Sequence, residues 1–254
     1  MQSDPFSKDL ADLTHGRAEP RRERRNPALR ARIDQALAKQ DRSWLTGRTG
    51  GRSWALSRSK RLTSALLALL LLLLLSPLLM VVAVLIKTSD PGPILFVQQR
   101  TGFRGRRFGM YKFRTMVADA EALKSSVRHL NKHGADAIDF KVDRDPRITP
   151  VGRWLRRTSI DELPNLLNVV RGDMRLVGPR PTSFKADTYL PGHLVRLSIY
   201  PGITGLWQVS GRSDLGFDDR VQLDMQYIEQ QSPWFDLRIL LKTPLKVLDG
   251  QGAS

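Results

Sequence analysis

The chain of 254 residues contains no cysteine and only four histidines. The absence of cysteine excludes disulfide bonds, thiolate metal sites and a cysteine nucleophile. His129 and His133 stand one helical turn apart, but no third ligand is evident beside them, which disfavours a histidine metal site. The sequence also lacks a Gly-x-x-x-x-Gly-Lys phosphate loop, a Gly-x-Gly-x-x-Gly fingerprint and a serine nucleophile elbow. Any catalysis must therefore rely on carboxylates and cationic side chains.

Cationic side chains are in excess. The 41 lysines and arginines outnumber the 25 acidic residues, which gives a formal net charge of +16. Such an excess predicts anionic partners: nucleic acid, acidic lipid or phosphorylated substrates. Residues 1–61 and residues 87–254 each carry a net charge of +8, and the segment between them is uncharged.

The first 60 residues are poor in large apolar side chains and rich in Arg, Ser, Gly and Asp. This composition predicts a flexible basic tail that contains at most a short helix near residues 29–38. The tail would either bind anionic membrane lipid or serve as an inert linker. A signal-peptide pattern is not visible, since the first apolar run begins too far into the chain.

Residues 62–86 form an uncharged, leucine-rich run of 25 residues that is typical of a membrane segment. Ser76 and Pro77 interrupt the run near its middle, where proline removes a backbone hydrogen bond. Both flanks are basic, and basic flanks prefer the cytoplasm. We therefore predict a re-entrant helix-break-helix over residues 61–88, broken at Ser76 and Pro77. A kinked spanning helix is the alternative.

The remainder, residues 89–254, mixes strand-like and helix-like patterns. Residues 94–98 form an apolar-polar stretch, residues 108–116 alternate as a strand does, and residues 145–149 predict a turn that leads into 151–157. A loop and helix are predicted over 185–199, and helices over 118–131, 215–230 and 232–248. The last of these would lie on the membrane surface or pack on the core. The sequence thus predicts an α+β monotopic membrane protein, with a small mixed α/β cytosolic catalytic domain and interfacial amphipathic helices.

Two adjacent carboxylates, Asp161 and Glu162, follow Arg156 closely. Residues 159–162 have the Ser-x-x-Glu form of a capping box, which predicts a helix from Asp161 to a stop at Gly172. Free N–H groups at such a helix start favour anions. Asp161 would be either a simple helix cap or part of a site for anions.

A carboxylate surrounded by arginines suits phosphoryl chemistry. Carboxylates can attack phosphoryl groups and form acyl-phosphate intermediates. Arginine side chains bind phosphate oxygens in bidentate fashion. A magnesium ion held by few carboxylates and several phosphate oxygens would offset the remaining negative charge.

Four separated motifs carry a resemblance to a known family. YKFRTM, LRRTSIDELPNLLNVVRGDM, VGPRP and PGITGLWQVSGR resemble, in the same order, the bacterial sugar transferases. This family comprises the monotopic phosphoglycosyl transferases that start exopolysaccharide and other surface glycan synthesis. The resemblance covers residues 62–248, including the break at Ser76 and Pro77, and is strongest to polyprenyl-phosphate galactose or glucose phosphotransferases. Only a basic tail precedes the membrane segment, which suggests a short-form enzyme.

The resemblance implies the chemistry and the roles of residues. A UDP-sugar would give its sugar 1-phosphate to polyprenyl phosphate, with Asp161 as nucleophile and Glu162 assisting in catalysis. Asp161 and Glu162 would also hold Mg²⁺, for which Mn²⁺ is an alternative. Phosphate-binding residues would be Lys112, Arg114 and Arg156. Nucleotide-binding residues would be Pro179, Arg180, Pro181 and Arg212. For each arginine the alternative is an ion pair that only holds the fold.

The resemblance also implies a location and partners. The enzyme would sit on the bacterial inner membrane, with its catalytic domain on the cytoplasmic face and anionic lipid as a further partner. A homodimer is compatible with the sequence, and no nucleic acid is expected. Two other functions compete with this interpretation: a membrane-tethered nucleic-acid binder, suggested by the charge of +16, and a non-catalytic scaffold of a polysaccharide assembly complex.

Overall fold

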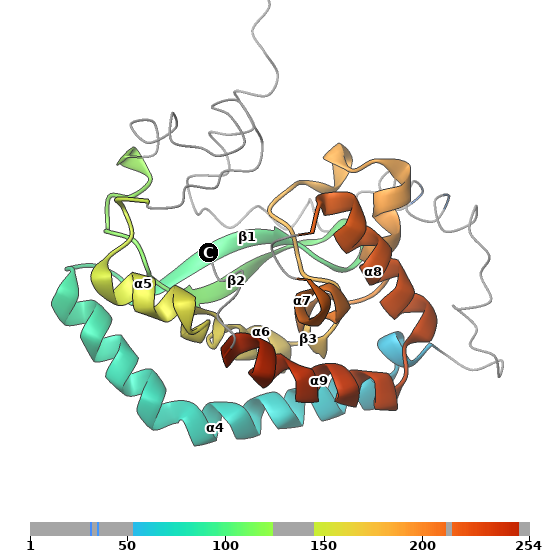
Figure 1. Ribbon diagram of the computed structural model, residues 1–254, viewed down its shortest axis with the longest axis horizontal. Helices are drawn as coiled ribbons and strands as arrows, with labels where there is room; N and C mark the ends of the chain where they lie inside the picture. The colour runs from blue at the N-terminus through green and yellow to red at the C-terminus, as the bar shows by residue number, and fades with distance from the viewer. Residues whose placement is uncertain (1–30, 32–34, 36–52, 124–144, 212–214, 249–254) are drawn as a thin grey trace, which may run out of the picture.

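The computed structural model of the protein describes residues 53–123, 145–211 and 215–248, together with Ala31 and Gln35 in a helix near the N-terminus. The described residues form one long helix, two small two-stranded sheets and a set of shorter helices (Figure 1). This confirms the predicted α+β class. Of the helix predicted near residues 29–38, only Ala31 and Gln35 are described, both as helical, and the rest of residues 1–52 lies outside the described residues.

The long helix α4 (Arg58–Ser89) contains the whole apolar run. Its first turn is capped by the Ser57 hydroxyl, which accepts a hydrogen bond from the Lys60 amide at 3.0 Å. Pro77 lies inside the helix, and the Ser76 hydroxyl donates to the Leu73 carbonyl at 2.8 Å. Figure 1 shows α4 running beneath the molecule and then turning upward toward α5. The predicted break is therefore a bend within one helix, because proline removes a hydrogen bond without ending the helix.

Both halves of α4 pack on the rest of the protein. Ala68 in the first half belongs to the main hydrophobic core, whereas Val82 and Ile86 in the second half pack with Phe113 and Leu155. The remaining surface of the helix is exposed and apolar, and only 11% of its most apolar window is buried. The helix is long and apolar enough to cross a membrane, and this exposure is compatible with membrane association.

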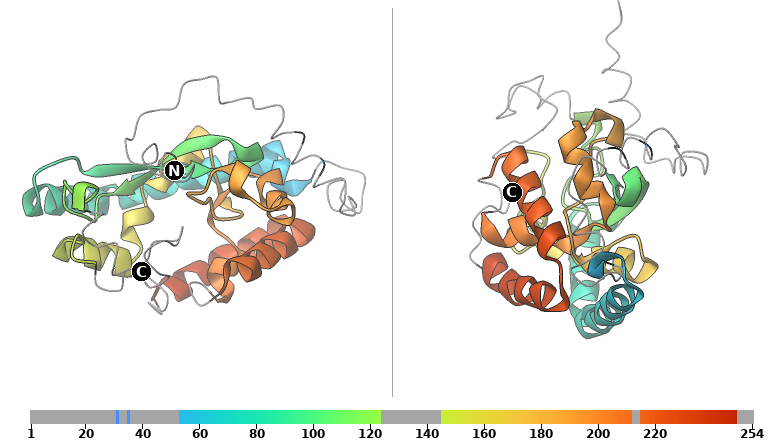
Figure 2. Two further views of the ribbon diagram at one scale, coloured as in Figure 1. Left: turned by 90° about the horizontal axis from the view of Figure 1, so that it is seen from above. Right: turned by 90° about the vertical axis from the view of Figure 1, so that its right-hand side faces the viewer.

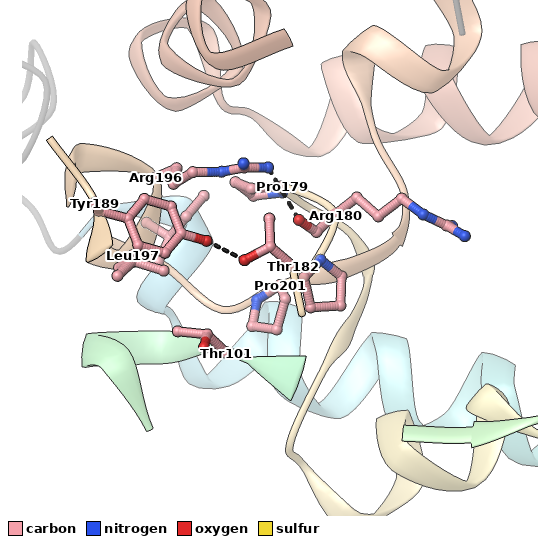
Figure 3. A pocket seen from close by; sticks show the side chains of 11 residues that line it. Thr101, Pro179, Arg180, Thr182, Tyr189, Arg196, Leu197 and Pro201 are labelled. Carbon is pink, nitrogen blue, oxygen red and sulfur yellow. Dashed lines mark hydrogen bonds between the residues drawn. The ribbon is translucent and has the colours of Figure 1, made fainter. Parts of the chain in front are cut away.

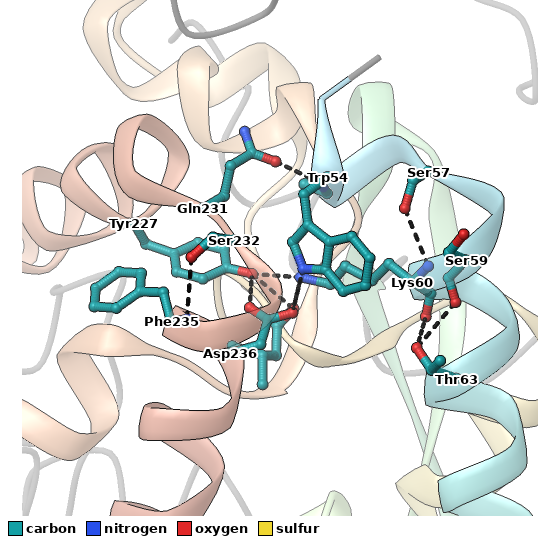
Figure 4. A network of polar contacts seen from close by, with 12 residues as sticks. Trp54, Ser57, Ser59, Lys60, Thr63, Tyr227, Gln231, Ser232, Phe235 and Asp236 are labelled. Carbon is teal, nitrogen blue, oxygen red and sulfur yellow. Dashed lines mark hydrogen bonds and ion pairs between the residues drawn. The ribbon is translucent and has the colours of Figure 1, made fainter. Parts of the chain in front are cut away.

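The start of α4 is attached to the last helix, α9 (Pro233–Leu248), by a buried polar network (Figure 4). Lys60 is only 2% exposed and forms an ion pair with Asp236 at 2.8 Å. The Tyr227 hydroxyl and the Trp54 indole also donate to Asp236, at 2.7 and 2.8 Å. Residues 53–60, which the sequence assigned to the end of the basic tail, are thus packed against α9.

Helix α9 has one buried face and one exposed apolar face. Ile239 is buried in the core, whereas Trp234, Leu237, Leu241 and Leu245 on the same helix are exposed. One face of α9 therefore packs on the core, which is one of the two arrangements predicted for this helix; the other was a position on the membrane surface. The other face is apolar and accessible.

An antiparallel ribbon follows α4. Strands β1 (Leu95–Thr101) and β2 (Arg107–Phe113) pair with Phe96 opposite Lys112 and Arg100 opposite Phe108. They are joined by the short 3₁₀ turn η3 (Phe103–Gly105). Figure 2 shows this ribbon and the C-terminal helices on opposite sides of the central elements.

Three short elements lead to the predicted carboxylate pair: helix α5 (Pro150–Arg157), the 3₁₀ turn η5 (Ile160–Glu162) and helix α6 (Asn165–Arg171). The predicted capping box is wrong. Ser159 adopts a left-handed conformation with φ of 57°, and its side chain makes no capping hydrogen bond. The helix therefore begins at Asn165 rather than Asp161, although Gly172 (φ 88°) caps its C-terminus directly after Arg171, as predicted.

The remaining elements close the fold. Strand β3 (Arg175–Val177) pairs in parallel with β4 (Gly202–Thr204). A Cβ at position 202 would lie 2.1 Å from the amide nitrogen of Gly178, so this close pairing requires glycine. Between the strands the chain forms the 3₁₀ turns η6 (Ala186–Thr188) and η7 (Pro191–Ser198), and after β4 the helices α7 (Leu206–Ser210) and α8 (Phe217–Gln230) follow.

Candidate active site

Asp161 and Glu162 lie in the turn η5, between two helices that fix its position. Asp161 is 8% exposed, so its carboxylate is largely removed from water. The turn is preceded by the left-handed Ser159, which redirects the chain after α5. Strand β2 contacts the turn from one side and supplies the nearest lysine, Lys112. Local backbone geometry therefore places two carboxylates beside a cation from a distant segment.

Glu162 is held by two cations. The Lys112 ammonium donates to its Oε1 atom at 2.9 Å. The Arg180 guanidinium binds both carboxylate oxygens, with one contact of 2.9 Å to Oε2. Burial alone would raise the pKa of Glu162, but Arg180 and Lys112 more than offset that effect and hold the pKa well below its usual range. Glu162 is therefore an anion whose oxygens are already occupied.

Asp161 is in the opposite situation. Within the described part of the chain, its carboxylate makes no hydrogen bond or ion pair. Burial raises its pKa to about 6, and the charge of Glu162 adds to that shift, whereas Lys112, Arg156 and Arg180 oppose it. The result is a buried carboxylate that titrates near neutral pH and whose oxygens are available for a new bond.

Two further cations approach the carboxylate pair. Arg156, in the last turn of α5, donates from Nε to the Thr115 hydroxyl at 2.9 Å and interacts electrostatically with Asp161. Arg100, on β1, interacts electrostatically with Arg180 and Glu162. We call these six residues the charge cluster: Arg100, Lys112, Arg156, Asp161, Glu162 and Arg180. Four cations face two carboxylates, so the charge cluster carries a formal net charge of +2, which suits a substrate with several negative charges.

Arg180 reaches the charge cluster from the Pro-Arg-Pro segment after β3. Pro179 and Pro181 line a small pocket on the other side of this segment, and Figure 3 shows the Arg180 side chain pointing away from that pocket. The Arg196 guanidinium donates to the Arg180 carbonyl at 2.9 Å and pairs with Asp224 at 2.7 Å. A buried ion pair therefore holds the main chain that presents Arg180.

The other predicted site residues lie elsewhere. Arg114 forms an ion pair with Asp90 at 3.1 Å and donates to the Pro91 carbonyl at 3.4 Å, which ties the segment after β2 to the end of α4. This matches the fold-holding alternative rather than a place in the charge cluster. Arg212 lies outside the described residues. Lys112, Arg156 and Arg180 are the predicted cations that the structure gathers around Asp161 and Glu162.

The carboxylates also limit how a metal could be held. The described residues contain no group of three or more His, Asp or Glu side chains that could bind a metal on their own. Magnesium commonly uses one or two carboxylates and completes its octahedron with substrate phosphates and water. Because the Glu162 oxygens are engaged by Lys112 and Arg180, the free oxygens of Asp161 are the available protein ligands. The residues thus fit Mg²⁺ only in a site shared with substrate phosphate oxygens.

Known proteins resemble this chain in sequence over most of its length. The family model described as bacterial sugar transferase matches residues 55–250. The galactosyl transferase CpsE of Streptococcus agalactiae serotype III is 48% identical over 168 residues, which cover 65% of this chain and 37% of that protein. The undecaprenyl-phosphate galactose phosphotransferase of Salmonella typhimurium is 47% identical over 169 residues, covering 65% and 36%. This chain therefore matches little more than a third of each of these two relatives.

A relative of more similar length is the exopolysaccharide production protein ExoY of Rhizobium meliloti. It is 39% identical over 188 residues, which cover 73% of this chain and 83% of that protein. The family match includes α4, the charge cluster and α9, so it extends over nearly all of the described residues. The chain belongs to the bacterial sugar transferase family.

Proposed function

We propose that the protein is a phosphoglycosyl transferase that moves a sugar 1-phosphate from a UDP-sugar to polyprenyl phosphate and thereby starts the synthesis of an exopolysaccharide or another surface glycan. Family membership and the names of the relatives support this proposal. One structural observation carries it: Asp161 is buried with free carboxylate oxygens, while the adjacent Glu162 is neutralised by Lys112 and Arg180.

In the first step, an Asp161 oxygen attacks the phosphorus that bears the sugar. A bond forms between that oxygen and phosphorus, and the bond to the oxygen that bridges the two phosphates breaks. UMP leaves with the bonding electron pair, and the sugar phosphate stays on Asp161 as an acyl phosphate. The carboxylate must be ionised for this attack, and a pKa of about 6 leaves it mostly ionised at neutral pH.

In the second step, a phosphate oxygen of polyprenyl phosphate attacks the same phosphorus. The acyl-phosphate bond breaks, the carboxylate of Asp161 is restored, and the product is a polyprenyl diphosphate sugar. Both steps move negative charge between oxygens within the same cluster. The excess of cations supports both, because fixed positive groups stabilise charge that develops on phosphoryl oxygens.

The cations would have separate tasks. Lys112 and Arg180 bind Glu162 and so keep the Glu162 carboxylate close to Asp161. In return, Glu162 would position both cations for contacts with the phosphates of the substrate. Arg156 is fixed by Thr115 and faces Asp161. Mg²⁺, bound by Asp161 together with phosphate oxygens, would neutralise charge on the transferred group. Mn²⁺ could occupy the same kind of site.

The packing of α4 supports a monotopic arrangement, and the basic flanks of the apolar run favour the cytoplasmic face of the inner membrane. A 32-residue helix is about 48 Å long, enough to cross a bilayer. However, both halves of α4 pack on one and the same domain. A helix that crossed the membrane would carry one half away from that domain. We therefore propose that α4 enters and leaves the same leaflet, with its exposed leucines in lipid.

The sugar is the least defined part of the proposal. Relatives are named for galactose, glucose and N-acetylgalactosamine. We favour galactose or glucose, because the Streptococcus agalactiae and Salmonella typhimurium relatives, at 48% and 47% identity, are both named for galactose transfer.

Release of UMP tests the proposed function. Purified full-length protein in nanodiscs, with Mg²⁺, UDP-galactose or UDP-glucose and polyprenyl phosphate, should release UMP. Asp161→Asn should lower that rate by more than roughly 10³-fold, as loss of a covalent nucleophile does in other enzymes. Asp173→Asn is the matched control, because Asp173 pairs only at 3.8 Å with an exposed arginine. Unchanged UMP release by Asp161→Asn would overturn the assignment of the nucleophile.

A further inference from the structure

Arg100 is the one cation of the charge cluster that lies outside the four sequence motifs. It lies on β1 opposite Phe108 of β2, and Lys112 lies on the same strand β2 opposite Phe96. Side chains at every second position of paired strands share one face of a ribbon. Phe108 and Met110 on this face are buried, so the face that carries Arg100 and Lys112 is turned toward the domain.

A backbone contact holds Arg100 close to Arg180. The next residue, Thr101, donates its amide to the Thr182 carbonyl at 2.9 Å, two residues beyond Arg180. Figure 3 shows Thr101 beside the Pro-Arg-Pro segment. The end of β1 is thus fixed to the segment that presents Arg180. Two arginines from separate parts of the chain are held next to each other by the main chain.

The Arg100 guanidinium has unused hydrogen-bonding capacity. Its Nη2 donates to the Gln98 side chain at 2.6 Å. Its Nε is buried and has no hydrogen-bond partner among the described residues. No carboxylate in the described part of the chain forms an ion pair with it. Burial lowers the pKa of Arg100 to about 10, and the neighbouring Arg180 contributes to that shift.

A partly buried guanidinium that, within the described fold, has no ion-pair partner and an unpaired Nε, and that lies beside another cation, is unfavourable in the ligand-free protein. The attraction of Glu162 and the hydrogen bond to Gln98 do not offset this cost, because the pKa of Arg100 is still lowered, and this favours an external anion as the further partner. A guanidinium presents Nε–H and Nη–H in a fork that matches two oxygens of a phosphate. The free Nε of Arg100 is one arm of such a fork.

We propose that Arg100 is a phosphate-binding residue of the active site, acting together with Lys112 and Arg180. This inference rests on the proposed function and adds a residue that neither the family match nor the names of the relatives assign. The shared ligand chemistry is a phosphate oxyanion. It could come from the diphosphate of the donor or from the phosphate of the polyprenyl acceptor, and the experiment has an arm for each source.

The first arm uses UDP and uridine as probes with the full-length protein in nanodiscs and titration calorimetry. Arg100→Gln should raise the Kd for UDP by about tenfold or more, the range expected for loss of a charged hydrogen bond. Arg100→Lys should give an intermediate loss, because it keeps the charge without the fork. Arg106→Gln is the matched control: it removes the same charge beside the same ribbon, at a side chain that is 52% exposed, and should change the Kd less than about twofold.

The second arm separates the two half-reactions. With the donor alone, the UMP burst reports the first step, and with polyprenyl phosphate added, turnover reports the second. Slower transfer in Arg100→Gln with an unchanged burst and an unchanged Kd for UDP would assign Arg100 to the acceptor phosphate. The midpoint of thermal unfolding serves as a fold control. It should stay level or rise in Arg100→Gln, because a buried unpaired charge is removed, whereas a purely structural role predicts a lower midpoint.

The outcomes distinguish this inference from the function on which it rests. Wild-type affinity for UDP together with wild-type rates of both half-reactions in Arg100→Gln would overturn the role of Arg100 and leave the proposed function intact. Wild-type protein that binds neither UDP nor polyprenyl phosphate would overturn both.

Discussion

Asp161 and Glu162 are neighbours in one turn, yet their environments push their pKa values in opposite directions. Glu162 is bound by Lys112 and Arg180, which keep it ionised. Asp161 has no such partner among the described residues, so burial dominates and raises its pKa to about 6. Divergent titration of adjacent carboxylates is the arrangement expected where the two have different tasks. Here one carboxylate organises the cations and the other is left to react.

The raised pKa predicts an acid limit on the first half-reaction. The Asp161 carboxylate attacks only when deprotonated, so kcat/KM for UMP release should be level above about pH 7. It should fall through a midpoint of about 6 and then decrease about tenfold per pH unit. The diphosphate of the donor does not titrate in this pH range, so the fall in kcat/KM at low pH reflects a titrating group of the enzyme. The check is a pH–rate profile with far-UV circular dichroism at each pH, and a profile that stays level down to about pH 4.5 would contradict the assignment.

At the scale of elements, the last helix and the start of α4 depend on one buried ion pair. Lys60 is 2% exposed and pairs with Asp236, which also accepts hydrogen bonds from Tyr227 and Trp54. Asp236→Leu leaves Lys60 buried without its partner, and should cost about 3–5 kcal/mol of unfolding free energy. Asp119→Asn, at an exposed aspartate, is the control and should change stability by less than about 0.5 kcal/mol. Equal unfolding midpoints for the two variants would show that the network does not anchor α4.

The elements that could be predicted from the sequence are those with a strong periodic pattern. The helices predicted over 215–230 and 232–248 correspond to α8 and α9 within a few residues, whereas residues 151–157, for which only a preceding turn was predicted, form α5. The capping box failed because its Ser-x-x-Glu pattern is short, and the left-handed conformation of Ser159 is set by the packing of the turn. Segments 186–188 and 191–198 form only 3₁₀ turns, since local propensity does not decide between such turns and a helix.

The candidate site was predictable only in part. Motifs identified Lys112, Arg156, Asp161, Glu162 and Arg180, which the fold brings together. The resemblance placed Arg114 beside Lys112 as a phosphate-binding residue, but β2 ends at Phe113 and Arg114 instead pairs with Asp90. Arg100 was not predicted because its place depends on the register between β1 and β2, which the sequence alone does not determine. Tertiary pairing, rather than local pattern, decides which arginines face the carboxylates.

At the scale of the whole molecule, both halves of α4 pack on one domain, which predicts that the two ends of α4 lie on the same side of the membrane. The chain has no cysteine, so Ser59→Cys and Ser89→Cys each introduce a single reactive thiol just inside either end of α4. In inverted membrane vesicles an impermeant maleimide should label both, and in right-side-out vesicles neither. Ser76→Cys, near the bend, is the control and should stay unlabelled from both sides because lipid covers it. Labelling of positions 59 and 89 from opposite sides would show that α4 crosses the membrane.

The proposed mechanism requires a covalent bond between Asp161 and a sugar phosphate, and mass spectrometry can detect this bond. The protein is incubated with Mg²⁺ and UDP-sugar without acceptor, quenched and digested with trypsin, which cuts after Arg157 and Arg171. We predict that the peptide 158–171 gains the mass of one hexose phosphate, with fragment ions that place it on Asp161 rather than Glu162. The adduct should disappear when polyprenyl phosphate is added. UMP release without any adduct on this peptide would contradict the mechanism.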